Sequence, residues 1–192
     1  DHLREALPVI KKKKYKACFD REPISEITSG FVLDYSDDLV LVNLVDCNFR
    51  LSGYSVVRYA DIQYYSSSED NPFEAAAIKK LELKPEPLKG VDLSGMEAAI
   101  MSAQKLFPIL SIHRELKDNE FLTGMVVDMG GGKFTICGPD TDMRDIALAK
   151  YSAKDVTRVD FGTGFEGAVE LTLGKAIRAF AGKRPMKGRA KG

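Results

Sequence analysis

The sequence repeats itself at a fixed spacing of 94 residues. Residues 30–66 align without a gap with residues 124–160, and six of the 37 aligned positions are identical, whereas average composition predicts roughly two. The identical pairs are Gly30/Gly124, Val32/Val126, Asp34/Asp128, Asp46/Asp140, Arg50/Arg144 and Asp61/Asp155. Apolar residues also recur in the same phase. A duplicated unit predicts one fold built twice, so every other motif has to be interpreted against its sister copy.

Each copy is predicted to form five short strands, which are rich in Val, Ile, Tyr and Phe and bounded by turn residues. In the first copy they span about 15–21, 27–35, 38–45, 54–59 and 62–66. A helix precedes the second set, because Leu93, Met96, Ile100, Ala103 and Phe107 share one helical face. Residues 3–7 are expected to form a shorter equivalent. The sequence thus predicts a mainly β chain with flanking helices, in which two tandem five-stranded small barrels form a pseudo-twofold repeat.

The domain boundaries follow from this interpretation. The first helix and barrel occupy residues 1–90, with the barrel at about 14–66 and a proline-containing linker at 84–90. The second helix and barrel occupy residues 91–182, with the barrel at about 107–162. Residues 183–192 form a basic tail whose composition is typical of a disordered segment.

Residues 161–167, FGTGFEG, contain the G-x-G-x-x-G spacing of a dinucleotide-binding turn. The repeat offers another explanation, because Phe165-Glu166 aligns with Phe73-Glu74, which follows an ordinary polar turn. A dinucleotide site also needs a βαβ unit and an acidic residue about 20 residues downstream, but the last acidic residue of the chain is Glu170. We interpret the stretch as the turn that leaves the second barrel, and we expect no nucleotide cofactor.

The chain offers little material for catalysis. It has two histidines, His2 and His113, and three dispersed cysteines, which favour free thiols in a reducing compartment over a disulfide framework or a zinc site. The segment DTDMRD at 140–145 lacks the glycine and final glutamate of a calcium loop, so a solvated acidic loop is favoured over a metal site. No apolar run reaches the ~20 residues of a membrane span. We expect a cytoplasmic, non-enzymatic protein without cofactor, metal or membrane contact.

Basic residues are concentrated at the two ends of the chain. The whole sequence has a net charge of zero, but residues 17–182 carry −9. The candidate contacts to nucleic acid or another anion are therefore terminal; they are Lys11, Lys12, Lys13, Lys14, Lys183 and Arg184. The alternative is that these ends are simply solvated.

Arg50 and Arg144 are the remaining candidate site residues, because each follows an aspartate by four positions in a repeated, irregular segment. A planar guanidinium suits a phosphate or carboxylate ligand. The favoured alternative is an internal ion pair, Asp46 with Arg50 and Asp140 with Arg144, that holds the loop between the third and fourth strands.

A helix followed by five strongly bent strands resembles the Sm-like small β-barrel. The segment GFVLDYSDDLVLVN (30–43) is similar to the first Sm motif in Gly30, Val32 and Tyr35. The chain also resembles uncharacterised bacterial proteins with tandem Sm-like or SH3-like barrels, whose second barrel ends in a strand of the TRVDFG type, here residues 157–162. This resemblance implies the small-barrel fold.

The resemblance does not carry RNA-binding residues across. The Sm aspartate and asparagine that hold bases fall at Ser36 and near Asp38, and the second copy has glycines there. The Arg-Gly of the second Sm motif is replaced by Arg58-Tyr59 in one copy and by Ser152-Ala153 in the other.

We therefore expect a binding or assembly module whose barrel edge strands pair with a protein partner or with another copy of the chain. The alternative is an Sm-like RNA-binding protein that uses its basic termini, with weak nucleic-acid binding because the body is acidic. Steep salt dependence would distinguish the RNA binder.

Overall fold

The computed structural model describes residues 2–21, 24–117, 121–140 and 143–183. The first half contains α1 (His2–Lys13), β1 (Lys16–Arg21), β2 (Ile24–Tyr35), β3 (Leu39–Val45), β4 (Leu51–Arg58), β5 (Tyr64–Ser67) and α2 (Pro72–Lys80). The second half contains α3 (Met96–Leu106), β6 (Leu110–His113), β7 (Phe121–Gly130), β8 (Lys133–Pro139), β9 (Ile146–Ser152), β10 (Arg158–Phe161) and α4 (Gly164–Gly182). A 3-10 helix precedes the last strand of each half, at Tyr59–Asp61 and Ala153–Asp155.

The same order of elements therefore occurs twice. β3 and β8, the two 3-10 helices, and β5 and β10 begin and end 94 residues apart, and the β2–β3 and β7–β8 ladders shift register at equivalent places. Two equivalent glycines meet the same steric requirement in each half. A Cβ atom at Gly30 would collide with the backbone carbonyl of Asn43, and one at Gly124 with that of Cys137. Only glycine allows this close approach of neighbouring strands.

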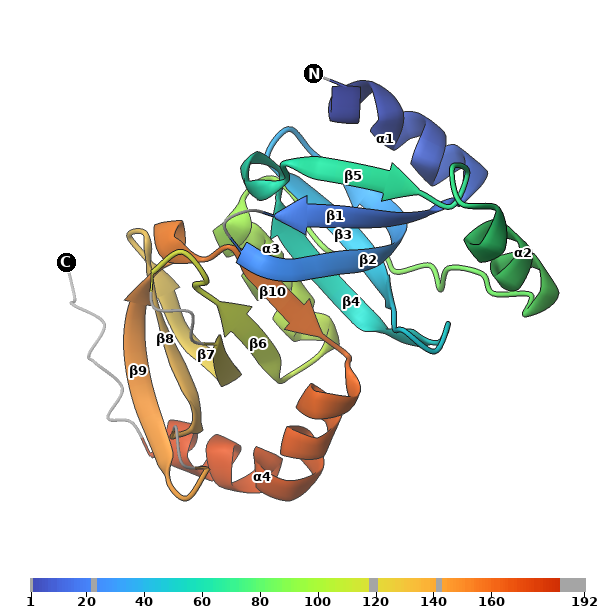
Figure 1. Cartoon of the computed structure of the whole chain (residues 1–192). Coiled ribbons are helices and arrows are strands. Elements are labelled where there is room, and N and C mark those ends of the chain that lie inside the picture. The colour runs from blue at the N-terminus through green and yellow to red at the C-terminus, as the bar shows by residue number, and fades with distance from the viewer. Residues whose placement is uncertain (1, 22–23, 118–120, 141–142, 184–192) are drawn as a thin grey trace.

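The ten strands form one antiparallel sheet in the order β5-β1-β2-β3-β4-β10-β6-β7-β8-β9 (Figure 1). The expectation of two closed five-stranded barrels is therefore wrong. Closing the first barrel would require β4 to pair with β5 of its own half, but the outer edge of β4 is occupied by β10. The sheet stays open, with β5 and β9 at its two ends.

The repeat itself is present, but its two halves do not meet about a twofold axis at their junction. A twofold axis at the junction would pair a strand with its own equivalent. Here the fourth strand of one half, β4, pairs with the fifth strand of the other, β10. The two halves are joined head to tail.

One hydrophobic core spans both halves. It combines Leu41, Tyr54 and Val56 of the first half with Ile112 and Phe161 of the second, and α3 contributes Ile100. A second cluster lies under α1, where Leu3, Leu7 and Ile10 are buried at helical spacing against β1–β4. A third lies between α4 and β8, around Cys137, Val169 and Ile177 (Figure 1). Because the largest cluster is shared, we expect the two halves to unfold together.

FGTGFEG forms the end of β10 and the start of α4. Thr163 caps the helix in a reciprocal capping box with Glu166, which satisfies backbone N–H groups that a helix start leaves without partners. Gly162 has a left-handed φ of 67° at the turn. Because β10 pairs antiparallel with both of its neighbours, the turn does not belong to a βαβ unit.

Candidate functional site

β10 connects the two halves because it is hydrogen-bonded on both sides. Arg158 lies opposite Val57 of β4 and opposite His113 of β6, and Phe161 lies opposite Tyr54 and Leu110 in the same way. Side chains alternate along the strand. Phe161 and Val159 therefore enter the shared core, while Arg158 and Asp160 lie on the other face, beside Ser55 and His113.

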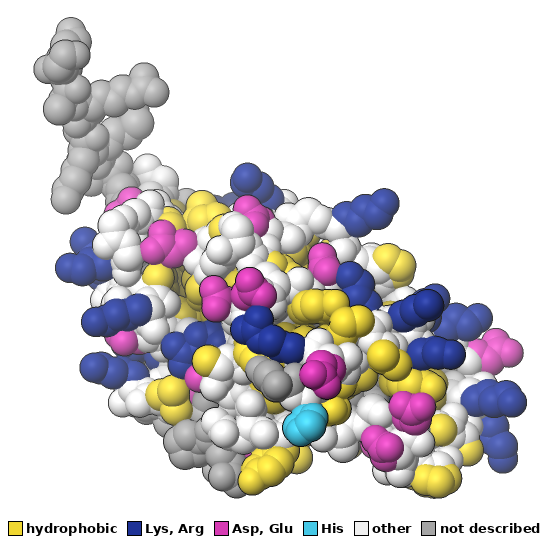
Figure 2. Space-filling model, turned by 90° about the horizontal axis from the view of Figure 1, so that it is seen from above, with side chains coloured by type: hydrophobic (Ala, Val, Ile, Leu, Met, Phe, Trp, Pro, Cys, Tyr) yellow, Lys and Arg dark blue, Asp and Glu magenta, His cyan; other side chains and the backbone are white. Residues whose placement is uncertain are grey.

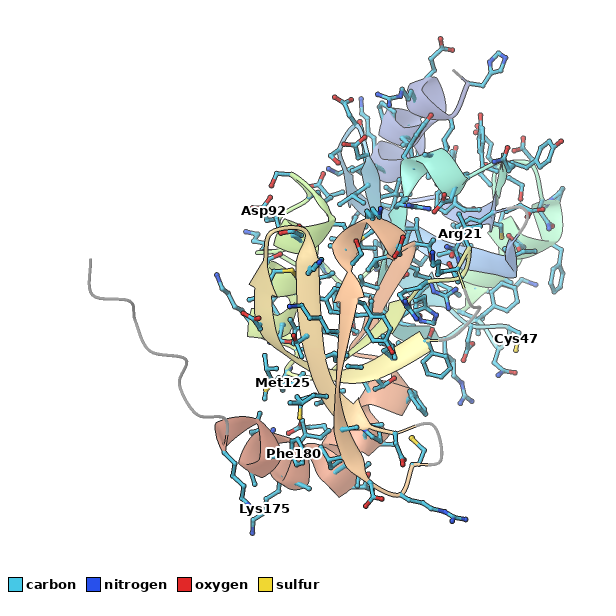
Figure 3. The ribbon with its side chains drawn as sticks, turned by 90° about the vertical axis from the view of Figure 1, so that its left-hand side faces the viewer. Arg21, Cys47, Asp92, Met125, Lys175 and Phe180 are labelled. Atoms are coloured by element: carbon cyan, nitrogen blue, oxygen red, sulfur yellow. The ribbon has the colours of Figure 1, made fainter. Side chains whose placement is uncertain are left out.

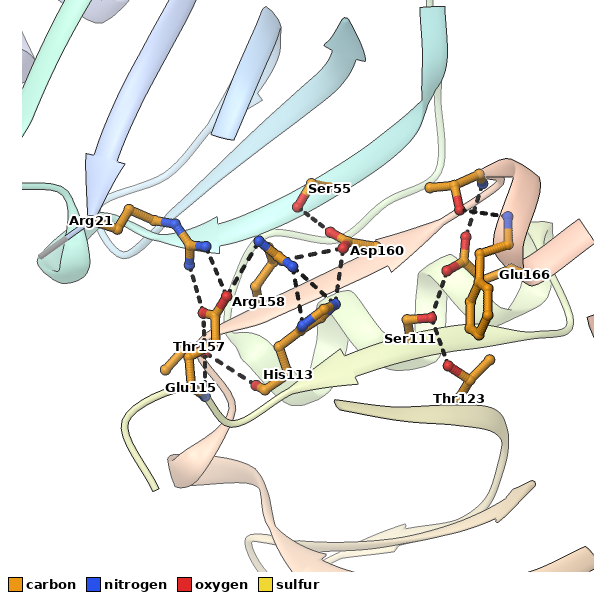
Figure 4. Close-up of polar contacts among 12 residues, drawn as sticks. Arg21, Ser55, Ser111, His113, Glu115, Thr123, Thr157, Arg158, Asp160 and Glu166 are labelled. Atoms are coloured by element: carbon orange, nitrogen blue, oxygen red, sulfur yellow. Dashed lines mark hydrogen bonds and ion pairs between the residues drawn. The ribbon is translucent and has the colours of Figure 1, made fainter. Parts of the chain in front are cut away.

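Glu115 is the centre of a buried ion cluster on that face (Figure 4). Its two carboxylate oxygens accept paired hydrogen bonds from Arg21, at 2.8 and 2.9 Å. The Thr157 hydroxyl donates to it at 2.6 Å, and Arg158 lies at 3.3 Å. The Arg21 side chain is fully buried and that of Glu115 is 5% exposed. Arg21 comes from the first half and Glu115 from the second, so this pair fixes one half against the other.

Asp160 is the second acidic centre of the face (Figure 4). It accepts hydrogen bonds from the Ser55 hydroxyl, at 2.6 Å, and from His113 Nε2, at 2.9 Å, and it lies 3.2 Å from Arg158 Nε. Arg158 also approaches His113 Nδ1, at 3.1 Å. One ring nitrogen of His113 therefore faces the Asp160 carboxylate and the other faces the Arg158 guanidinium. Since Ser55 donates to Asp160 and not to His113, these side chains do not form a nucleophile–base relay.

The environment lowers the pKa of both carboxyls. Burial alone would raise the pKa of Glu115, but hydrogen bonds from Arg21 and Thr157 and the nearby charges of Arg158 and Arg21 hold it below its ordinary 4.5. Burial likewise opposes ionisation of Asp160. The hydrogen bond from His113 and the charge of Arg158 outweigh it, so the pKa of Asp160 lies below 3.8.

Acid is therefore expected to destabilise the junction between the halves. A carboxyl whose folded pKa is depressed contributes stability that is complete above its unfolded pKa and is lost as pH falls through the folded value. Urea unfolding from neutral pH downward should show Asp160→Asn less stable than wild type, with a difference that shrinks below the ordinary carboxyl value of 3.8. A difference that stays constant to the lowest pH would contradict the assignment.

The two outer strands offer a different kind of surface. β5 carries Tyr64 and Tyr65, which are 67% and 36% exposed, and β9 carries Leu148 at 41%. β5 contains no charged residue and β9 contains one, Lys150. Within the described part of the chain no strand lies beyond either of them. Their outward backbone groups are thus available for pairing.

A hollow of about 650 Å³ opens beside β9. Its walls are mostly apolar and include Phe121, Ile136, Gly138, Ala149, Tyr151 and Phe165. In the first half, Leu44 stands at the position of Gly138. The hollow and the free edge of β9 are continuous, since Ala149 and Tyr151 belong to both.

The structure places Arg50 and Arg144 on exposed loops, and their aspartates serve the loop backbone. Asp46 Oδ1 accepts the backbone N–H groups of Asn48 and Arg50. Asp140 Oδ1 accepts that of Arg144 at 2.8 Å. The repeated Asp–Arg spacing thus marks a loop that an aspartate closes through backbone N–H groups, and not the side-chain ion pair that we favoured.

The basic candidates are not brought together. Lys11, Lys12, Lys13 and Lys14 lie at the exposed end of α1, where Lys11 pairs with Asp34 at 2.7 Å. Lys183 follows α4, and Arg184 lies outside the described residues. On the face shown in Figure 2, lysines and arginines are spread out and interspersed with acidic side chains. No single basic patch is seen on that face.

Sequence reasoning missed the buried ion cluster. Arg21 lies inside the molecule, whereas Cys47 lies at its surface (Figure 3). No local pattern in the sequence pointed to the cluster, because Arg21 and Glu115 lie 94 residues apart in different halves of the chain. In the described part of the chain, no group of three His, Cys, Asp or Glu side chains has the geometry of a metal site.

Comparison with protein-family models, with curated proteins and with solved structures returns no match. Among the described helices none combines the length and the apolar character that crossing a membrane requires.

Proposed function

We propose that this protein is a non-enzymatic binding or assembly module that holds its partner through the free edges of its sheet. One observation supports this most directly: the chain already joins two copies of its own repeat by adding β10 to the edge of β4. Addition of a strand to a sheet edge supplies main-chain hydrogen bonds for affinity and side-chain pockets for specificity.

The chemistry of the outer strands supports the proposal. Edges that must stay unpaired are commonly protected by lysine, proline, bulges or a covering element. β9 extends over seven residues with one lysine and no proline, and apolar side chains are exposed on both β5 and β9. The hollow beside β9 supplies a pocket for one or two side chains of an added strand.

Affinity capture with edge variants tests the proposal. Leu148→Lys places a charge on β9 and Tyr64→Lys places one on β5. Leu171→Lys is the matched control, because Leu171 is an 89% exposed apolar residue of α4 and belongs to neither edge strand. Wild type and Leu171→Lys should retain from a nuclease-treated native lysate a polypeptide that an edge variant loses. A second copy of this protein counts as such a polypeptide. If every retained species is the same for all four proteins, the proposal fails.

RNA binding through the basic termini is the second candidate. A hollow of about 490 Å³ beside the β2–β3 turn contains Arg4, Tyr35, Ser36 and Tyr59. The arginine and the two tyrosines carry the planar groups on which a base stacks. Arg4, however, is held by Asp37 at 2.8 Å, and the body carries −9. Nuclease treatment and a salt series distinguish this candidate. Retention of a partner through RNA would be lost after nuclease treatment and would fall steeply as the salt concentration rises.

A further inference from the structure

We propose that the strand partner is a second copy of this chain, with β9 of one copy paired to β5 of the next. This inference rests on the proposed edge-binding function and names its partner. β9 and β5 are, in their own halves, the equivalents of β4 and β10, which already pair within the chain. The junction between copies would therefore repeat the junction between halves.

The register of the new ladder follows from the repeat. Inside the chain, Arg158 lies opposite Val57 and Asp160 lies opposite Ser55. Shifting each residue by the 94-residue spacing places Tyr64 opposite Tyr151 of the next copy. In the same way Ser66 lies opposite Ala149, and Ser67 opposite Leu148.

The β4–β10 junction inside the chain and the proposed β9–β5 junction between copies carry different side chains, so a strand of one junction does not suit the other. The internal junction matches charged with polar residues, since Asp160 bonds Ser55 and Arg158 bonds Asp160 and Glu115. At the free edges the equivalent positions carry Tyr64, Ser66, Ala149 and Tyr151, which are uncharged. The two free edges, β5 and β9, are therefore alike in carrying uncharged side chains at the positions that would face each other.

An exchanged pairing would be costly. If β10 of one copy added to β9 of another, Asp160 would face Ala149 in place of Ser55, and Arg158 would face Tyr151. Glu115 would also be separated from Arg21, which belongs to the first half. Buried charges that lose their partners oppose association strongly. This penalty against β10 would favour β5 as the partner of β9 as much as the apolar contacts between β5 and β9 do.

The turns that would meet at the new junction also fit. Inside the chain a two-residue turn, 162–163, follows β10 and presses on Gly53, where a Cβ atom would lie 2.7 Å from Gly162 and Thr163. A four-residue turn, 68–71, follows β5, and the residue that would face it on β9 is Ala147. Gly53 faces the short turn after β10, and Ala147 would face the longer turn after β5, where a Cβ atom has more room.

The proposed contact would also cover the hollow beside β9. Tyr151 and Ala149 line that hollow, and the register brings Tyr64, which is 67% exposed, directly opposite Tyr151. Burial of the two tyrosine rings would remove apolar surface from water on both copies. Because β9 and β5 are different surfaces, the contact is heterologous and generates a ring or an open filament.

The experiment measures mass by light scattering on the purified full chain, with circular dichroism to verify the fold of every variant. Wild type and the Leu171→Lys control should exceed the single-chain mass of 21.2 kDa as concentration rises. Leu148→Lys and Tyr64→Lys should each associate about tenfold or more weakly, because each buries an unpaired charge.

Mixing the two edge variants gives the decisive result. Leu148→Lys keeps an intact β5 and Tyr64→Lys keeps an intact β9, so a one-to-one mixture should form a two-chain complex that neither variant forms alone. Wild type that keeps the mass of a single chain overturns the inference. So does an edge variant that associates as tightly as wild type, or a mixture that associates no more tightly than either variant alone. Edge-dependent capture of a different polypeptide would then leave the proposed function standing without the second copy.

Discussion

Replacement of Glu115 by alanine is expected to lower the free energy of unfolding by about 3–5 kcal/mol, the typical cost of removing one partner from a buried ion pair. Glu115 accepts two hydrogen bonds from Arg21 and one from Thr157, and it lies 3.3 Å from Arg158. Its loss leaves the fully buried Arg21 guanidinium without a counter-charge. Urea unfolding of the full chain at neutral pH measures the change.

Arg178→Ala provides the matched control for this prediction. Arg178 pairs with Glu170 at 2.6 Å, but its side chain is 49% exposed. Surface ion pairs of this kind contribute about 0–1 kcal/mol. A Glu115→Ala variant that loses no more stability than Arg178→Ala would show that the Arg21–Glu115 contact does not hold the two halves together.

The positions of the strands could be predicted from the sequence because their signals are local. Alternating apolar residues and the turns between them lie within a few residues of each strand. Every strand expected in the first copy corresponds to one of β1–β5, with ends that differ by a few residues. The helix before the second copy is present as α3, and the expected helix at residues 3–7 extends to Lys13.

The pairing of the strands could not be predicted in the same way. Whether β4 meets β5 or β10 depends on contacts between distant residues, such as Arg21 with Glu115 and Ser55 with Asp160. No local pattern records them. The barrel expectation assumed that the fourth and fifth strands of each repeat pair with each other. Instead β4 pairs with β10, the fifth strand of the other repeat, and β9 lies at the end of the sheet.

The contrast between local signals and contacts of distant residues also explains which site residues the sequence could predict. Alternation along β10 puts Asp160 on the face opposite Val159 and Phe161, but alternation alone cannot say which side chains contact it there. Ser55 and His113, from the two neighbouring strands, and Arg158 of β10 make these contacts. The repeated Arg50 and Arg144 attracted attention because they recur. Asp46 and Asp140 explain the recurrence through backbone hydrogen bonds, to which the arginine side chains do not contribute.

Replacement of Phe161 by alanine is expected to destabilise the chain by about 3–5 kcal/mol, the usual cost of deleting a buried phenylalanine ring. Phe161 is fully buried. Its ring stacks on Tyr54 of the first half at 5.8 Å and lies 5.5 Å from Phe107, which follows α3. The aromatic residue that opens FGTGFEG therefore belongs to the core that the two halves share.

Phe73→Ala is the control, because Phe73 occupies the exposed surface of α2, is 72% exposed, and should change stability by about 0.5 kcal/mol or less. Since the shared core includes side chains from both halves, Phe161→Ala should lower the midpoint of one cooperative urea transition followed by far-ultraviolet circular dichroism. Two separate transitions in wild type, or a Phe161→Ala variant as stable as Phe73→Ala, would show that the halves fold independently and that β10 does not unite them.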